Sequence, residues 1–174
     1  MPYKGKLVVA LLNINSLRSK IHEIQFMLDQ QQLDILVLNE TKLDDNDDQS
    51  LFEFPSYECF RRDRAKIGRG IGGGIMVYIK KQLQVSNVVI DETNEIISFI
   101  FRTDGKELGL IACYRPPHPE NENIFFEAVT NIVDRLDELS KEILIIGDLN
   151  FDLLDDFKSR KLLDFIAAHG LTNT

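Results

Sequence analysis

Polar residues stand at the ends of four apolar, strand-like segments, and these are the positions from which the chain could do chemistry. A strand end fixes a side chain on a rigid scaffold at the mouth of a crevice. The five residues concerned are Asn13, Glu40, Tyr114, Asp148 and Asn150. Each one alone also has an ordinary explanation, such as turn chemistry for an asparagine or a solvated loop for a glutamate. Their recurrence at four strand ends favours a common site.

The segment LIIGDLNFD gives the sharpest of these signals. Asp148 and Asn150 are two positions apart, so an extended chain would point both side chains to one side. A carboxylate beside an amide suits a magnesium–phosphate site, because Mg²⁺ takes few carboxylates and completes its shell with water and phosphate oxygens. The same ligand types would accept Mn²⁺. An EF-hand loop is excluded, since Leu153 replaces the turn glycine and Ser159 the twelfth-position glutamate.

The elements that must position these residues alternate between strand-like and helix-like segments. Apolar, β-branched runs predict strands at 6–12, 34–39, 57–62, 73–79, 84–90, 96–102, 108–113 and 142–146. Apolar stripes at helical spacing predict helices from the Asn15-Ser16 cap to about Gln31, across 125–139, and over 158–169 before Gly170. The start therefore reads as βαβ and the middle as an antiparallel meander with a hairpin turn at Asp104-Gly105. This pattern predicts an α/β fold with mixed sheets and helices outside.

The bulk properties are those of one globular domain. The chain has 174 residues, of which 44% are hydrophobic, and its net charge is −8. This charge argues against a protein that coats nucleic acid by bulk attraction, although an enzyme can still grip phosphates locally. No apolar run is long enough for a membrane span, and no signal peptide is recognisable. Cys59 and Cys113 read as buried free thiols, which indicates a reducing compartment, the nucleus or the cytoplasm.

In order and approximate spacing, these segments resemble the endonuclease/exonuclease/phosphatase superfamily. The similarity is greatest to the apurinic-endonuclease-like domain of non-LTR (LINE-type) retrotransposon proteins. It rests on LNINSLRSK, DILVLNETKL, GGGIMVYIKK, ACYRPP and ILIIGDLNFD, and it runs from Lys6 to about Thr172. The resemblance implies a four-layer α/β sandwich, with two mixed β-sheets packed face to face and helices outside.

The resemblance also implies a role for each matching residue. Glu40 would be the main metal ligand, and Asn13 would help to place the metal or its waters. Tyr114 would contact the scissile phosphate, Asp148 would orient or deprotonate the attacking water, and Asn150 would hydrogen-bond the phosphate. The implied cofactor is Mg²⁺, with Mn²⁺ as an alternative, and the implied substrate is DNA. This agrees with the need of phosphodiester hydrolysis for a metal and a polarised water.

The sequence departs from the family pattern near its C-terminus. The family has a later strand with an aspartate and a terminal Ser-Asp-His segment, and neither appears before Thr174. His22, His118 and His169 occupy no matching position. Residues 1–174 are therefore expected to be an incomplete domain that lacks the C-terminal strands and part of the active site. A C-terminal reverse-transcriptase domain in a longer protein is a possible partner.

A glycine-rich loop precedes the strand at 73–79. Gly68, Gly70 and Gly73 fit G-x-G-x-x-G, but a strand follows them instead of the helix that a dinucleotide site requires. The flank of this loop is basic, and it could be a solvated surface or a contact to DNA phosphates. The candidate DNA-contacting residues are Arg61, Arg62, Arg64, Lys66 and Arg69.

Three functions remain open at this point. The leading hypothesis is a Mg²⁺-dependent endonuclease that nicks target DNA and leaves a 3′-hydroxyl to prime reverse transcription. A phosphatase or phospholipase of the same superfamily, acting on inositol phosphates or sphingomyelin, is the alternative within the fold. A catalytically incomplete remnant that only binds nucleic acid or a partner is the alternative outside enzymology.

Overall fold

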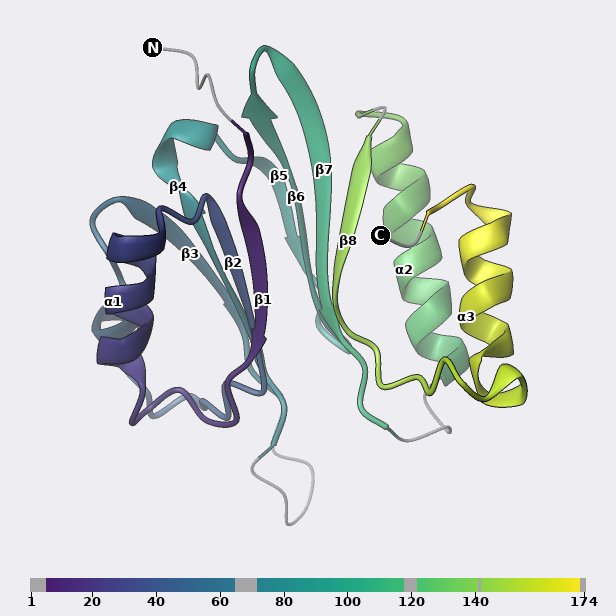
Figure 1. Ribbon diagram of the computed structural model, residues 1–174, viewed down its shortest axis with the longest axis horizontal. Helices are drawn as coiled ribbons and strands as arrows, with labels where there is room; N and C mark the ends of the chain where they lie inside the picture. The colour runs from purple at the N-terminus through teal and green to yellow at the C-terminus, as the bar shows by residue number, and fades with distance from the viewer. Residues whose placement is uncertain (1–5, 65–71, 118–121, 141, 173–174) are drawn as a thin grey trace.

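The computed structural model describes residues 6–64, 72–117, 122–140 and 142–172. Two four-stranded mixed sheets pack face to face, and helices cover their outer surfaces (Figure 1). Helix α1 lies on the outer face of the first sheet, and helices α2 and α3 lie outside the second. The predicted four-layer α/β sandwich is therefore confirmed.

The first sheet has the strand order β1-β2-β4-β3. Its strands are β1 (Val9–Asn13), β2 (Ile35–Asn39), β3 (Tyr57–Arg62) and β4 (Ile75–Lys80). Strands β1 and β2 are parallel and are joined by α1 (Ile21–Gln31), as the predicted βαβ start requires. Strand β4 runs antiparallel to both β2 and β3. Two short 3₁₀ turns, η1 (Gln49–Phe52) and η2 (Lys81–Leu83), complete this half.

The second sheet has the order β5-β6-β7-β8. Its strands are β5 (Ser86–Ile90), β6 (Glu95–Thr103), β7 (Lys106–Tyr114) and β8 (Ile143–Asp148). Strands β5, β6 and β7 are antiparallel neighbours, whereas β8 is parallel to β7. Helix α2 (Glu122–Asp137) connects β7 to β8, and α3 (Asp156–Ala168) follows. Neither these helices nor the rest of the described chain includes a helix long and apolar enough to cross a membrane.

The apolar core forms three layers because side chains alternate between the two faces of each central strand. Leu36 and Leu38 of β2 pack toward α1, whereas Ile35 and Val37 pack against the second sheet. Strand β6 likewise places Phe99 between the sheets. Strands that are buried on both faces must be apolar throughout, which is why they read as continuous hydrophobic runs.

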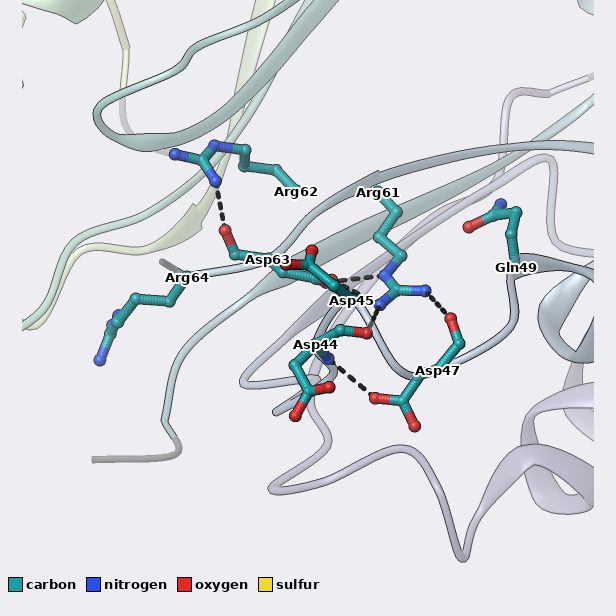
Figure 2. Close-up of a pocket in the computed structure, with 8 residues that line it drawn as sticks. All are labelled: Asp44, Asp45, Asp47, Gln49, Arg61, Arg62, Asp63 and Arg64. Atoms are coloured by element: carbon teal, nitrogen blue, oxygen red, sulfur yellow. Dashed lines mark hydrogen bonds and ion pairs between the residues drawn. The ribbon is translucent and has the colours of Figure 1, made fainter. Parts of the chain in front are cut away.

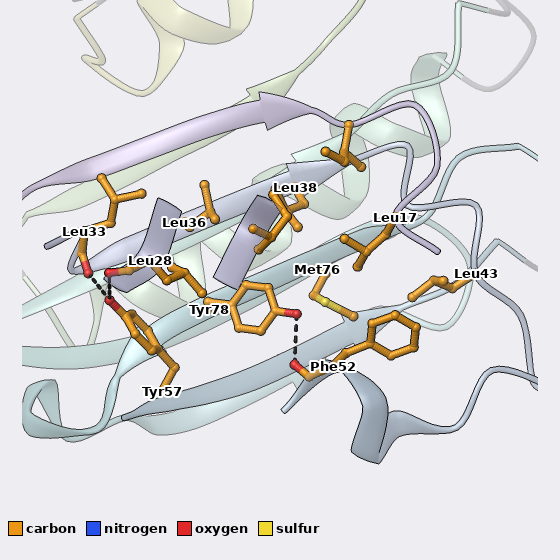
Figure 3. Packing of buried hydrophobic residues seen from close by; sticks show 12 residues of the cluster. Leu17, Leu28, Leu33, Leu36, Leu38, Leu43, Phe52, Tyr57, Met76 and Tyr78 are labelled. Atoms are coloured by element: carbon orange, nitrogen blue, oxygen red, sulfur yellow. Dashed lines mark hydrogen bonds between the residues drawn. The ribbon is translucent and has the colours of Figure 1, made fainter. Parts of the chain in front are cut away.

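The layer between α1 and the first sheet contains two buried tyrosines, whose rings fill it and whose hydroxyls are satisfied (Figure 3). The Tyr57 hydroxyl donates to the carbonyl oxygen of Leu33 at 2.7 Å. The Tyr78 hydroxyl donates to that of Phe52 at 2.9 Å. Buried tyrosines are tolerated when the hydroxyl finds such a partner.

Two local expectations are wrong. Helix α1 begins at Ile21, because Asn15 and Ser16 adopt positive φ values of 47° and 83° and cannot start a helix. The middle strands do not form one meander, since β4 pairs with β2 and β5 belongs to the other sheet. The hairpin turn at Asp104-Gly105 is confirmed, with φ values of 48° and 76° that fit a type I′ turn.

Strands β1 and β8 are the edges of their sheets, and within the described chain each has a strand partner on one side only. From their apolar composition, 6–12 and 142–146 are expected to be buried strands; both expectations are wrong, and Leu11 keeps 40% of its surface exposed. All six residues of β8 are partly exposed as well. The two edges lie next to each other and run along the same side of the sandwich (Figure 1). Long apolar edges are templates for further strand pairing.

Strand β8 approaches β7 closely at Gly147, the residue before Asp148. The register pairs Cys113 with Gly147 and Tyr114 with Asp148. A Cβ atom at Gly147 would lie 1.8 Å from the carbonyl oxygen of Cys113. That atom belongs to the backbone, so no rotamer change relieves the contact. Glycine is therefore required for the register that places Asp148 beside Tyr114.

We expect Gly147→Ala to push β8 away from β7 and to lower the free energy of unfolding by about 1–3 kcal/mol. Gly109→Ala is a matched control, because its Cβ would meet side-chain atoms of Leu136 and Ile143 at 3.2 and 3.3 Å, which can shift. Urea titration followed by circular dichroism measures both variants. Equal destabilisation of the two would contradict the proposed close approach.

Candidate active site

The candidate site lies at the open end of the layer between the two sheets. In β1, β2, β7 and β8, alternate residues pack into this layer. The last residue of each strand continues the alternation and so faces the same layer. These residues are Asn13, Asn39, Tyr114 and Asp148. The register sets Asn13 opposite Asn39 in the first sheet and Tyr114 opposite Asp148 in the second.

Hydrogen bonds join the predicted residues across the gap between the sheets. The Asn13 Nδ2 atom donates to Glu40 Oε1 at 2.9 Å and to Asp148 Oδ2 at 3.3 Å. The Tyr114 hydroxyl donates to the same Glu40 oxygen at 3.3 Å. The structure therefore brings together four residues that are up to 135 positions apart in the sequence. Their catalytic roles stay predictions.

The carboxylate of Glu40 is held in its ionised form. The hydrogen bond from Asn13 lowers the pKa of Glu40 below its usual 4.5, and the positive charge of Lys42 acts in the same direction, against the effect of burial. The Lys42 Nζ atom lies 3.7 Å from Glu40 Oε2. An ionised carboxylate is the state that a metal ion requires of its ligand.

Tyr114 is packed against a fixed arginine. The guanidinium carbon of Arg64 lies 5.5 Å from the centre of the Tyr114 ring. Arg64 Nε pairs with the carboxylate of Glu95, which is 6% exposed and is the register partner of Tyr114. Burial raises the pKa of Tyr114, and the negative charge of Glu40 raises it further. The hydroxyl therefore stays protonated and can donate a hydrogen bond to an anion.

Asp148 and Asn150 meet through a turn, so the expectation of an extended chain between them is wrong. Asn150 has a left-handed φ of 50°. Its backbone N–H donates to Asp148 Oδ1 at 3.1 Å, and its Nδ2 atom donates to the carbonyl oxygen of Arg115 at 2.8 Å. One carboxylate oxygen of Asp148 is thus fixed by the turn and the other by Asn13.

The donor set fits a single hard cation. Within the described residues, no three His, Cys, Asp or Glu side chains gather into a metal cage. Glu40 would supply a carboxylate oxygen beside the amide oxygen of Asn13, and Asp148 is hydrogen-bonded to the same asparagine. Mg²⁺ prefers one or two carboxylates and completes its coordination shell with water and phosphate oxygens. Mn²⁺ accepts the same ligands.

The loops at this end of the sandwich contain unusual backbone conformations. Glu40 and Lys42 have φ values of 56° and 54°, in addition to Asn150 and the Asn15-Ser16 pair. Each such residue costs on the order of 1 kcal/mol and persists only where the surroundings impose it. Here the backbone N–H groups of Thr41 and Lys42 donate to the carbonyl oxygens of Gly74 and Gly73. The end of the glycine loop therefore fixes the loop that carries Glu40.

A pocket of about 590 Å³ lies beside the site, and Arg64 contributes to both (Figure 2). Arg61 reaches across it and donates to the carbonyl oxygens of Asp44 and Asp47 at 2.6 and 2.9 Å. Its guanidinium also pairs with the Asp63 carboxylate. The complete lining is Asp44, Asp45, Asp47, Gln49, Arg61, Arg62, Asp63 and Arg64. An ion pair and hydrogen bonds link Arg61 to acidic residues of this pocket, so the pocket is not an open basic surface.

The candidate DNA-contacting arginines are engaged inside the protein. Arg62 Nε donates to the carbonyl oxygen of Asp91 at 2.6 Å, and Arg64 is held by Glu95. Lys66 and Arg69 lie outside the described residues. Contact between this group and DNA stays a prediction.

Sequence reasoning missed three polar contributors to the site. Asn39 reads as an ordinary strand residue, yet its Nδ2 atom donates to the Cys113 carbonyl oxygen at 3.3 Å and links the two sheets. Lys42 pairs with Glu40. Arg115 holds the loop after Asp148. The alternation of side chains in β2 predicts that Asn39 faces the layer between the sheets. Arg115 donates hydrogen bonds to backbone carbonyl oxygens, and no local sequence pattern predicts these bonds.

With this geometry established, comparison with known proteins assigns the chain to a family. The profile of the endonuclease/exonuclease/phosphatase family matches residues 10–171. The chain belongs to this family. Its members include nucleases and phosphatases, hydrolases that generally depend on a divalent metal. Comparison with curated proteins gives no match.

Solved structures share the fold. The endonuclease domain of TRAS1, a telomere-specific non-LTR retrotransposon, has a TM-score of 0.72 at 17% identity, over 95% of this chain and 71% of that one. The Xenopus laevis APE2 catalytic domain has a TM-score of 0.69 at 17% sequence identity, and the match covers 91% of this chain and 67% of that one. The Neisseria 3′ phosphatase NExo, bound to a product DNA hairpin, has a TM-score of 0.65 at 19% sequence identity. The match covers 96% of this chain and 72% of that one. At these identities the likeness concerns the fold.

We expect Asn39→Asp to destabilise the protein far more than Asn39→Leu. Asn39 is fully buried, and its Oδ1 atom has no hydrogen-bond partner among the described groups. Leucine removes one hydrogen bond, at a cost of about 1 kcal/mol. Aspartate buries an unpaired charge beside the Cys113 carbonyl, at a cost of roughly 3–5 kcal/mol. Urea titrations at pH 7 measure both values, and equal stability of the two variants would refute this account.

A second expectation concerns acid stability at the pocket of Figure 2. Arg18 donates to both carboxylate oxygens of Asp47, at 2.7 and 2.6 Å, and this lowers the pKa of Asp47 below its usual 3.8. A lowered pKa in the folded state stabilises the fold above the usual value, and this stabilisation disappears as the pH falls through the folded value.

Asp47→Asn should therefore lower the free energy of unfolding at pH 7 by up to about 1 kcal/mol, since Arg18 is 40% exposed. It should also make stability fall less steeply below the usual pKa of Asp47. Asp45→Asn, at an exposed neighbour, is the control. Unfolding midpoints across an acid pH series give the result, and identical pH profiles for Asp47→Asn and the wild type would contradict the expectation.

Proposed function

We propose that this chain is the DNA-nicking endonuclease domain of a non-LTR retrotransposon protein. It works with Mg²⁺ and leaves a 3′-hydroxyl from which reverse transcription is primed. The observation that carries the proposal is the hydrogen-bonded set of Asn13, Glu40, Tyr114 and Asp148 at the open end of the sandwich. These residue types supply what phosphodiester hydrolysis needs, namely a metal ligand, a hydrogen-bond donor to the phosphate and a general base.

Each residue has a role that its contacts support. Mg²⁺ at Glu40 and Asn13 would offset the negative charge that develops on the phosphate. Asp148 orients or deprotonates the attacking water, because hydrogen bonds fix both of its carboxylate oxygens. Tyr114 donates to the scissile phosphate. Asn150 uses one Nδ2 hydrogen on Arg115, and the second is left for a phosphate oxygen.

DNA is the proposed substrate. The similar structures support it, since one is described as a retrotransposon endonuclease domain and another is bound to a product DNA hairpin. The net charge of −8 requires that phosphates be gripped locally. Lys42 and Arg64 are suited to this, because both lie beside Glu40 or Tyr114.

Strands from outside residues 1–174 would complete the domain. The described strands leave β1 and β8 open on adjacent sheet edges, and the matched structures extend beyond the aligned region. In a longer polypeptide, which would also carry a reverse-transcriptase domain, these strands would bring the aspartate and histidine that the family resemblance implies.

A nuclear or cytoplasmic location fits the two free cysteines, of which Cys113 is buried.

The test is a nicking assay on supercoiled plasmid with Mg²⁺. It compares the 174-residue chain with a longer version that includes the family's Ser-Asp-His segment, each as wild type and as Asp148→Ala. We expect Asp148→Ala to lower the nicking rate by roughly 10²- to 10⁴-fold. Asp164→Ala, at a side chain that is 75% exposed on α3, is the control that should keep the activity.

Each outcome has a defined meaning. Nicking by the longer protein alone would show that residues outside 1–174 complete the site. Nicking by the short chain, abolished by Asp148→Ala, would show that the described residues suffice. Hydrolysis of soluble phosphoesters without nicking would replace the endonuclease proposal with a phosphatase. No activity in either version, with folding intact, would leave a binding remnant and refute the proposal.

A further inference from the structure

Arg115 follows Tyr114 and is a buried cation for which the described residues provide no carboxylate at ion-pair distance. Only 5% of its surface is exposed. No carboxylate of the described chain forms an ion pair with it, and burial lowers its pKa, although arginine stays protonated at neutral pH. A buried charge is costly unless hydrogen bonds compensate for it. The contacts that compensate for Arg115 therefore indicate what the residue does.

Among the described residues, the side chain of Arg115 contacts three consecutive residues after Asp148. Its Nε atom donates to the carbonyl oxygen of Leu149 at 2.7 Å, and its Nη2 atom donates to that of Asn150 at 2.8 Å. The guanidinium carbon lies 4.0 Å from the centre of the Phe151 ring. One planar group thus holds two carbonyls and one aromatic face at once.

The backbone of Arg115 adds two further bonds. Its N–H donates to the carbonyl oxygen of Asp148 at 3.0 Å, which extends the pairing of β7 and β8 past the strand ends. Its own carbonyl oxygen accepts from Asn150 Nδ2 at 2.8 Å. The turn that contains Asp148 and Asn150 is therefore clamped from both sides by a single residue.

We propose that Arg115 is a positioning residue, whose guanidinium fixes the turn 148–151 so that Asp148 and Asn150 are presented to the phosphate. This inference rests on the proposed nuclease function and deepens it. Lysine cannot replace this arginine, because an ammonium group lacks the planar fork that reaches two carbonyls and stacks on a ring. Tyr114 thus faces the site, while Arg115 holds the turn that follows Asp148, the register partner of Tyr114.

The first experiment is Arg115→Lys in whichever version of the protein nicks DNA. The variant keeps the charge and loses the geometry. We expect kcat to fall on the order of 10- to 100-fold with little change in KM, because a small misplacement of the reacting groups slows the chemical step. Arg135→Lys is the matched control, since Arg135 donates to the hydroxyl of Ser98 and the carbonyl of Asn87. It should keep the wild-type kcat.

The second experiment needs no activity. In the 174-residue chain, the Asn150 Nδ2 proton that donates to the Arg115 carbonyl oxygen should exchange more slowly than the side-chain amide protons of Asn87, as followed by ¹H–¹⁵N NMR. Arg115→Lys should remove this protection while the amides of the buried strand β2 stay protected. If Arg115→Lys does not fold, Phe151→Leu loosens the guanidinium without removing it. That variant should show partial loss of protection of the Asn150 amide.

Two results would overturn the inference. One is an Asn150 amide that exchanges as fast as that of Asn87 in the wild type. The other is a variant, Arg115→Lys or Phe151→Leu, that matches the wild type in both kcat and amide protection. Absence of nicking by the wild type would count against the proposed function instead, and the NMR experiment would still decide whether Arg115 clamps the turn.

Discussion

The site depends on the alternation of side chains in strands that face one another across the sandwich. Apolar residues fill the layer between the sheets until the strands end, and the last residue of β1, β2, β7 and β8 on that face is polar. Polar groups at such a boundary cost free energy unless they pair. Asn13, Tyr114 and Asp148 reach the site by this alternation, and Glu40, the left-handed residue after β2, joins Asn13 and Tyr114 by hydrogen bonds.

This constraint explains which parts could be predicted from the sequence. Glu40 and Asp148 were predictable because each comes at the end of a long apolar run. The start of α1 was not, since the left-handed conformation of Asn15 and Ser16 depends on bonds to the loop after β2. Arg115 was also missed, because its partners lie 34 and 35 positions away and are backbone carbonyls, which carry no residue-specific signal.

The charge distribution shows how an acidic protein can present a site for an anionic substrate. Arg61 forms an ion pair with Asp63, which offsets much of its long-range field, whereas Arg62 donates to backbone carbonyl oxygens and keeps its charge. Lys42 and Arg64 are held beside Glu40 and the ring of Tyr114, two of the predicted catalytic residues. Fixed cations act on a bound phosphate without having to reorganise, which is the electrostatic requirement of catalysis.

One additional strand could extend a sheet and also add a residue to the site. Asn13 and Asp148 end β1 and β8, two neighbouring edge strands of the described sheets. A further strand that paired with β8 in the same direction would end beside Asp148, and alternation would turn one of its last side chains into the layer between the sheets. Such a strand would both cover an apolar edge and bring a side chain to the catalytic end. Folding and chemistry would therefore be completed by the same segment.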